Sequence, residues 1–439
     1  MIAPARLAAF EVLRTVGNRR ADLGAALARV RSRLGDERDR ALAGEIATGT
    51  LRWQGAFDHV IAAFANRPLR RFDPEVLDIL RLTMFQLLHL DRIPAAAAVK
   101  DAVDLAGKAG KRSAAGLVNA VLRRVDRERD RLPVPARPGD PSDRDAAVAY
   151  LSITLSHPEW LIERWLDRHG FAATEAWARF DNAPAPLTLR ANTLRISRDA
   201  LAARLAAEGM PVEPGVHSPD ALVVRQGNPL TSAMHDEGLF VIQDEASQLV
   251  GQRVGASAGE RVLDACASPG GKTLVMAGAM NGRGTIVATD VRGRRVDLLR
   301  RTVARAGVPN VAIVQADAAA GLPFGPIFDR VLLDAPCSGL GTIRRDPDIK
   351  WRRRPEDLPG LAAAQLAMLE RAGDVVTPGG SLTYATCSSE PDENEAVVDT
   401  FLLRRPDFTS EGEPFRTLPF RDGLEAFFAA RLVRARHLR

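Results

Sequence analysis

The stretch Val262-Leu-Asp-Ala-Cys-Ala-Ser-Pro-Gly-Gly-Lys-Thr273 reads as a short β-strand, a loop of small residues and the start of a helix. Further strands follow it, separated by helical spacers such as residues 293–306 and 361–376. Strand–helix alternation at this spacing is typical of a parallel, doubly wound sheet with crossover helices. We therefore predict an α/β Rossmann-like domain over residues 236–439, with residues 427–436 as a final edge strand. Its predicted strands are Arg261–Ala265, Thr285–Asp290, Val311–Gln315, Arg330–Asp334 and Ser381–Ala385.

The loop after the first strand is predicted to bind a nucleotide-like cofactor. Ligands of open α/β sheets bind at the carboxyl ends of the strands, and small residues let the backbone approach them closely. A P-loop would need glycine where this chain has Cys266, and the dinucleotide motif GxGxxG is absent. The predicted loop ligands are Cys266, Ala267, Ser268, Pro269, Gly270, Gly271 and Lys272.

Acidic residues end several of the predicted strands. Asp290 is placed to accept both hydroxyls of a ribose, and Asp317 to meet an adenine amino group. Asp264 and Asp334 lie in register with them. Carboxylates also suit the cationic end of S-adenosylmethionine, so we predict this cofactor, with Arg295 and Asp334 completing its site.

Two cysteines stand in motifs that suit nucleophilic chemistry, Asp334-Ala-Pro-Cys337 and Thr386-Cys387-Ser388. A thiolate that adds to carbon 6 of a pyrimidine makes carbon 5 electron-rich, so that carbon 5 can accept a methyl group. A carboxyl group must then bond the ring N3, and a base must remove the carbon 5 proton. A buried, inert thiol is the alternative role, and for Cys266 it is the favoured one.

These motifs together resemble the RNA cytosine-C5 methyltransferase family, whose catalytic domain has the class I methyltransferase fold. The resemblance implies that Cys387 attacks carbon 6, that Cys337 assists product release, and that Asp334 contacts the base near the methyl donor. DNA cytosine methyltransferases instead use the Pro-Cys thiol as the nucleophile, so substitution of each cysteine separates the two possibilities.

The first 125 residues are predicted to form an all-α domain. Asp73-Pro74-Glu75 has the N-cap, proline and acid of a helix start, and residues 76–90 read as a buried central helix. Residues 117–125 repeat apolar side chains on one helical face. A proline-rich linker over 126–145 and a small α+β subdomain over 146–235 follow, with strands at 187–192 and 222–225 around a helix at 197–208.

Motifs in this half extend the resemblance to nearly the whole chain. Residues 49–55, 87–94 and 116–124 are similar to the NusB-like helical domain, and 156–158 and 243–247 match the RsmB (Sun/Fmu) family of 16S rRNA methyltransferases. The resemblance implies a cytoplasmic enzyme that forms 5-methylcytosine in 16S rRNA. Alternatives are the same chemistry on tRNA or another RNA, an RNA-binding module with a vestigial catalytic domain, and, more remotely, a NAD-type oxidoreductase.

A cation-rich segment follows the Pro-Cys motif. Its position and its cations around an indole predict contact with an RNA backbone, and a solvated charge run is the alternative. Arg52, Arg123 and Arg124 are weaker candidates in the helical domain. The predicted RNA-binding residues of the segment are Arg344, Arg345, Lys350, Trp351 and Arg352.

Composition restricts the remaining classes. The net charge is +5, three cysteines argue against a disulfide framework, and no Cys/His cluster has zinc spacing. No run of 18 apolar residues is present, so we expect no membrane span. The lack of zinc spacing predicts no metal. Nothing in the sequence demands a partner chain, so we expect a monomer.

Overall fold

The computed structural model describes residues 2–436, which form two compact units. Within the described residues, the first comprises 2–184 and 343–355, and the second comprises 185–342 and 356–436. The segment 343–355 therefore belongs to the helical unit, although it follows a predicted active-site motif of the other unit. Along the described residues, no helix is both long and apolar enough to cross a membrane.

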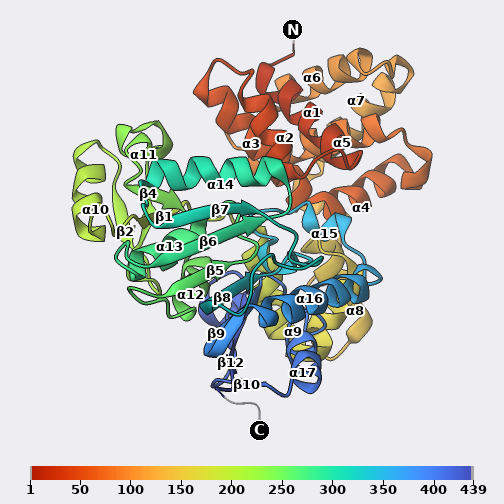
Figure 1. Ribbon diagram of the computed structural model, residues 1–439. Coiled ribbons are helices and arrows are strands. Elements are labelled where there is room, and N and C mark those ends of the chain that lie inside the picture. The colour runs from red at the N-terminus through yellow and green to blue at the C-terminus, as the bar shows by residue number, and fades with distance from the viewer. Residues whose placement is uncertain (1, 437–439) are drawn as a thin grey trace. The chain divides into compact units, whose positions relative to one another are not determined.

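The helical unit contains the predicted bundle (Figure 1). Helix α5 (Pro74–His89) packs against α1, α3, α4, α6 and α7, which confirms the predicted central helix. In α7 the apolar face of Val118, Val121, Leu122 and Val125 is buried, as its spacing predicts. The other helices are α1 (Pro4–Gly17), α2 (Leu23–Arg31), α3 (Glu37–Arg52), α4 (Gln54–Ala65) and α6 (Ala95–Lys108).

Two further helical elements also belong to this unit. They are α8 (Arg144–Ala149), which continues into a π-helical turn, and α9 (Glu159–Asn182), which is kinked at Gly170. The sequence predicted residues from 146 onward to be part of the small α+β subdomain. In the structure these helices group with the bundle, and the second unit begins at Ala185. The predicted domain boundary stays a prediction.

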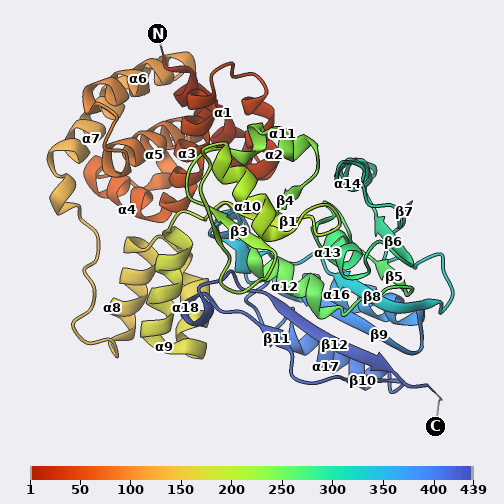
Figure 2. The same cartoon turned by 90° about the vertical axis from the view of Figure 1, so that its left-hand side faces the viewer.

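The second unit begins with a small antiparallel sheet of strand order β2-β3-β1-β4, covered by α10 (Arg198–Ala207) (Figure 2). Its last strand pairs with β1, so the small sheet continues past the predicted boundary at residue 235. The strands are β1 (Thr188–Ala191), β2 (Val212–Pro214), β3 (Ala221–Val224) and β4 (Phe240–Ile242).

The large sheet has the order β10-β12-β9-β8-β5-β6-β7, with β11 paired to β12. Strands β7, β6, β5, β8 and β9 are parallel, as predicted. Strand β12 runs antiparallel to β9, and β10 runs antiparallel to β12. The chain's last strand is not at the edge, because β10 and β11 pair with its outer side. The strands are β5 (Arg261–Asp264), β6 (Thr285–Asp290), β7 (Val311–Gln315), β8 (Phe328–Asp334), β9 (Val376–Thr386), β10 (Phe408–Ser410), β11 (Phe415–Arg416) and β12 (Phe428–Arg434).

Helices cover both faces of this sheet (Figure 1). Alternate side chains of β8 enter separate cores, Leu332 into one and Val331 and Leu333 into the other. The first core contains α12 (Glu245–Arg253), α13 (Gly271–Ala279) and α14 (Gly293–Ala306), and the second contains α16 (Asp357–Asp374) and α17 (Glu395–Arg404). Burial on both faces leaves the carboxyl edge of the parallel strands as the place for a ligand.

Candidate active site

The predicted cofactor loop joins β5 to α13. Gly270 has φ of 108°, a conformation that favours glycine, and a Cβ there would lie 2.9 Å from Leu299 Cδ1. The Cβ position of Gly271 lies 3.2 Å from the Gln243 side chain. The glycines therefore serve close packing of the loop against α14 and the residues before α12.

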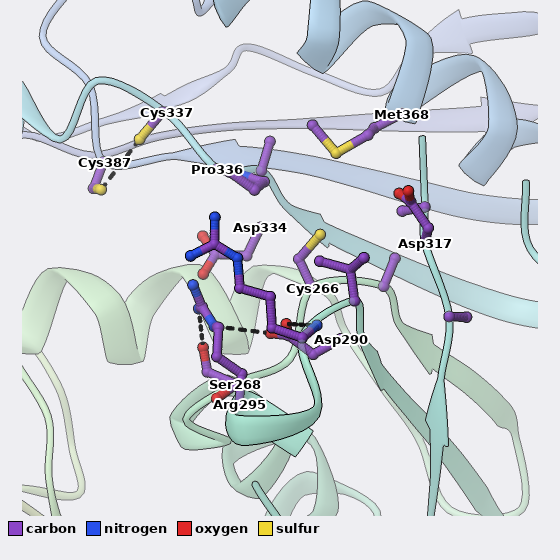
Figure 3. A pocket seen from close by; sticks show the side chains of 16 residues that line it. Cys266, Ser268, Asp290, Arg295, Asp317, Asp334, Pro336, Cys337, Met368 and Cys387 are labelled. Carbon is purple, nitrogen blue, oxygen red and sulfur yellow. Dashed lines mark hydrogen bonds and ion pairs between the residues drawn. The ribbon is translucent and has the colours of Figure 1, made fainter. Parts of the chain in front are cut away.

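A cavity of about 330 Å³ opens where β5, β6, β7 and β8 end. It brings together eight of the predicted site residues, from five separate stretches of the chain, and Figure 3 shows the two thiols at one end and Asp317 at the other. Pro336 and Met368 also line it, and the sequence motifs did not indicate Met368. The predicted residues on the cavity wall are Cys266, Ser268, Asp290, Arg295, Asp317, Asp334, Cys337 and Cys387.

The remaining predicted loop ligands do not line this cavity. Ala267, Pro269, Gly270 and Gly271 shape the loop behind the wall, and Lys272 turns its ammonium group to Asp334. A direct contact of these five residues with the cofactor stays a prediction.

One side of the cavity is held by an ion pair. Asp290 Oδ2 lies 3.1 Å from Arg295 Nε, and Arg295 Nη2 donates to the Ser268 carbonyl at 2.7 Å (Figure 3). The Ser268 hydroxyl oxygen is buried and has no hydrogen-bond partner within the described residues. An unpartnered hydroxyl beside carboxylates fits a ligand that carries hydroxyl groups and positive charge, and S-adenosylmethionine has both.

Asp264 lies behind the cavity rather than on its wall. It is 1% exposed, and Thr273 Oγ1 donates to its Oδ2 at 2.7 Å, so it joins β5 to α13. Burial raises the pKa of Asp264 to about 7. Burial and the nearby Asp264 carboxyl raise the pKa of the Cys266 thiol well above its ordinary range, which agrees with an inert cysteine at that position.

The other two thiols meet in space although 50 positions separate them in the chain. Strands β8 and β9 pair in parallel with Asp334 opposite Ala385, so the loops after both strands emerge side by side. Cys337 Sγ lies 3.2 Å from Cys387 Sγ, and both are free cysteines. The hydrogen bond to Cys337, followed by burial, raises the pKa of Cys387 well above its ordinary range, and the Lys272 ammonium acts in the opposite direction.

Lys272 completes this end of the site. Its Nζ donates to Asp334 Oδ2 at 2.7 Å and lies 5.4 Å from the centre of the Phe427 ring. Burial disfavours the ammonium, but the Asp334 carboxylate outweighs burial and the pKa of Lys272 is raised. A charged lysine, a carboxyl group and two thiols therefore converge at one end of a cofactor-sized cavity.

Comparison with known proteins identifies the family. The family model described as 16S rRNA methyltransferase RsmB/F matches residues 254–433. The chain is 37% identical to ribosomal RNA small subunit methyltransferase B of Pseudomonas putida, over 91% of this chain and 89% of that protein. The chain belongs to the RsmB/F family. A Bacillus subtilis relative, named "Probable ribosomal RNA small subunit methyltransferase B", is 36% identical over 87% of this chain and 84% of its own.

The other parts of this RsmB/F-family chain match as well. The NusB family model covers residues 3–127, and the ferredoxin-like domain of RsmF/B-like methyltransferases covers 157–231. The crystal structure of PH0851 superposes with a TM-score of 0.82 at 27% identity, covering 98% of this chain and 99% of that one. A methyltransferase homologue from Pyrococcus horikoshii has a TM-score of 0.58 at 28% identity, covering 66% and 99%. These matches confirm the predicted fold classes and the resemblance.

The cation-rich segment has a different environment from the one predicted. Lys350 in α15 (Ile349–Arg352) is fully buried in the helical unit, where its Nζ donates to the Arg52 carbonyl at 2.9 Å. Trp351 Nε1 donates to the Leu51 carbonyl at 2.5 Å. Both side chains hold the segment against α3, and their contact with RNA stays a prediction.

The arginines of the same cation-rich segment also make contacts within the helical unit. Arg344 Nη2 donates to the Pro184 carbonyl at 2.7 Å, and its guanidinium lies over the Phe180 ring. Arg352 pairs with buried Asp348 at 3.1 Å, and Arg52 donates to the Arg344 carbonyl. Arg345, like Arg344 and Arg352, is half-buried, whereas Arg123 and Arg124 on α7 are exposed and remain predicted RNA contacts.

Proposed function

We propose that this protein methylates carbon 5 of a cytosine in 16S rRNA, with S-adenosylmethionine as the methyl donor and a covalent cysteine–carbon 6 adduct as the intermediate. The observation that carries the proposal is the thiol pair, 3.2 Å apart, beside the Lys272–Asp334 ion pair at one end of the cavity. The choice of 16S rRNA follows from the family and from the names of the relatives.

The cavity provides the side chains that would hold the cofactor. Asp290 would accept the ribose hydroxyls, Asp317 would meet the adenine amino group, and the Ser268 hydroxyl would gain its missing partner. When bound, S-adenosylmethionine supplies a methyl group on a positively charged sulfur, which is the electrophile that the reaction needs. Asp334 lies on the same wall and would orient both the cofactor end and the target base.

Cys387 is the proposed nucleophile. In the resting site its thiol is protonated, because its hydrogen bond to Cys337 and its burial raise its pKa, so it is inert until the target base enters. The Lys272 ammonium favours the thiolate that attacks carbon 6. As carbon 6 is attacked, the thiol proton of Cys387 would pass to Asp334, and the protonated carboxyl would donate a hydrogen bond to N3 as negative charge develops on the ring, which is electrostatic stabilisation of that step.

Cys337 is the proposed base of the release step. It lies next to the nucleophile, so its thiolate can take the carbon 5 proton once carbon 5 carries the methyl group. Loss of that proton restores the ring double bond and breaks the bond between Cys387 Sγ and carbon 6. Without Cys337, the enzyme should stay attached to its RNA.

The test is transfer of labelled methyl groups from S-adenosylmethionine to 16S rRNA by the wild-type protein, Cys387→Ala and Cys337→Ala. We expect label in 5-methylcytosine with wild type, no transfer with Cys387→Ala, and a denaturation-resistant protein–RNA adduct with Cys337→Ala. Thermal unfolding of all three proteins controls for loss of fold.

Two outcomes would contradict parts of the proposal. Activity in Cys387→Ala together with inactivity in Cys337→Ala would make Cys337 the nucleophile. Transfer to tRNA but not to 16S rRNA or to the small subunit would keep the chemistry and replace the substrate.

A further inference from the structure

A buried acidic side chain lies between the two thiol loops. Glu393, in the loop between β9 and α17, is fully buried within the second unit. Its Oε1 accepts hydrogen bonds from the Ser338 backbone N–H and from Gln365 Nε2, both at 2.8 Å. Its Oε2 accepts the Ser388 hydroxyl at 2.5 Å. One carboxyl group therefore receives donors from three separate parts of the chain.

Two of these donors are the immediate neighbours of the thiols. Ser338 follows Cys337 and Ser388 follows Cys387, and their hydroxyl oxygens lie 3.1 Å apart. The third donor, Gln365 on α16, also donates to the Pro336 carbonyl at 3.0 Å. Both thiol loops are thus attached to the same buried group, one residue away from each sulfur.

The position of Glu393 is itself fixed by the core of the sheet. The Tyr384 hydroxyl on β9 donates to the Glu393 carbonyl at 2.6 Å, and its oxygen lies 3.2 Å from Gln365 Oε1. Tyr384 is fully buried among the side chains that pack under α16 and α17. A hydrogen-bond network in which each member is satisfied and buried is rigid, because breaking any bond leaves a polar group without a partner.

We infer that Glu393 is a positioning residue that sets the distance and direction between the two thiols. The inference rests on the proposed function for its catalytic consequence, but not for its geometry. A base must reach the carbon 5 proton while the nucleophile stays bonded to carbon 6, so the two sulfurs need a defined separation. An error of about 1 Å in such a placement is enough to slow a step by on the order of a hundredfold.

Glu393→Gln tests this role with little change in size. The amide keeps one acceptor oxygen, and its NH2 group replaces the other. If that group takes the place of Oε2, the Ser388 hydroxyl can no longer donate to this side chain, and the hold on the Cys387 loop is weakened. We expect product release to slow by at least about tenfold, with accumulation of the denaturation-resistant RNA adduct that Cys337→Ala also gives. The KM for S-adenosylmethionine should stay within about twofold, since Glu393 does not line the cavity.

A second readout needs no RNA. At a pH raised until a thiolate forms, thiols 3.2 Å apart should be oxidised to a Cys337–Cys387 disulfide by diamide, which mass spectrometry of the peptides detects. In Glu393→Gln this oxidation should slow by at least about tenfold, because one sulfur no longer faces the other. Cys337→Ala controls for disulfides formed with Cys266.

Glu395→Gln is the matched control. Glu395 lies two positions further along, at the start of α17, where it pairs with Arg416 and touches neither thiol loop. It should retain wild-type oxidation and release rates. Should Glu393→Gln fail to fold, Ser388→Ala removes a single hydroxyl donor and should give the same two changes more weakly.

Wild-type rates of both disulfide formation and release in a folded Glu393→Gln protein would overturn the inference. Slowed oxidation in Glu393→Gln, together with no RNA adduct even in Cys337→Ala, would retain the positioning role. It would overturn the proposed function instead. A lower melting temperature with both rates unchanged would make Glu393 a residue of stability alone.

Discussion

The loops that carry the thiols, residues 335–342 and 387–394, differ from the segment of residues 343–355 in what their polar atoms face. In the sheet unit, Asp334, Cys337 and Cys387 line a cavity, and a buried network behind them holds their loops in place. In the helical unit, Lys350 and Trp351 direct their polar atoms to main-chain carbonyls of α3. Adjacent stretches of chain therefore differ in role: the first is the proposed site of the chemistry, and the second stabilises the helical unit.

The free-energy cost of burying a charge explains why Lys350, in the segment of residues 343–355, is tied to partners within the helical unit. Burial lowers the pKa of Lys350 to about 7. Burial also raises the pKa of Asp181, which interacts electrostatically with Lys350, to about 8. Buried charges of this kind persist only with partners, since an unpaired one is strongly destabilising. Lys350 therefore contributes to the stability of the helical unit, and its contact with RNA stays a prediction.

The largest expected effect is at the sheet edge. Asp334→Asn removes the negative partner of Lys272 and the carboxyl group beside the thiols, so methyl transfer should fall by about 10³-fold or more, or about 4 kcal/mol. Asp329→Asn, at the other end of β8, where Asp329 accepts the Arg261 N–H, should change the rate little. Single-turnover assays with melting curves measure both. An Asp334→Asn protein within about tenfold of wild type would place the chemistry elsewhere.

The next effect concerns stability rather than catalysis. Lys350→Met removes a cation near Asp181 and the donor to the Arg52 carbonyl and Asn182 Oδ1, so urea unfolding should show a loss of about 2–4 kcal/mol. Lys108→Met, the same change at an exposed position of α6, should cost nothing measurable. If Lys350 instead bound RNA, the change would spare stability, weaken RNA binding and reduce the salt slope by about one.

The sheet edge was predictable because its pattern is local and its topology is regular. Two predicted strands and one helix, at 285–290, 311–315 and 293–306, coincide with β6, β7 and α14. In a parallel sheet each strand's carboxyl end reaches the same edge, so an acid or thiol that ends a strand can be placed without coordinates. The cavity accordingly contains Asp290, Asp317 and Cys387 as predicted.

What the sequence did not indicate depends on contacts between distant segments. Glu393 becomes the centre of the thiol loops only because α16 brings Gln365 to it. Lys272 stands in a loop whose residues favour a cofactor, yet its long side chain reaches Asp334. A run of arginine and lysine has the same composition whether it is solvated or buried, so Lys350 could be placed only by the structure.

A smaller effect is expected on the cofactor. Asp290→Asn replaces a charged acceptor and releases Arg295, so the Kd for S-adenosylmethionine should rise by about tenfold, or about 1.4 kcal/mol. Calorimetric titration measures the change. Asp297→Asn, an exposed acid of α14 that pairs with Arg300, should bind the cofactor as the wild type does. An unchanged Kd in Asp290→Asn would remove this residue from the cofactor site.

The smallest effect is a shift in the pH dependence of one thiol. The hydrogen bond to Cys337 is the main cause of the high pKa of Cys387, so Cys337→Ala should lower that pKa towards the ordinary value of about 8.5. More thiolate is then present at any pH below the wild-type pKa, and the alkylation of Cys387 by iodoacetamide should reach its midpoint at lower pH. Cys337→Ser keeps a hydrogen-bonding group and should shift the midpoint less. A midpoint equal to wild type in Cys337→Ala would mean that burial alone protects the nucleophile, and the thiol pair would then have no part in keeping it inert before the base arrives.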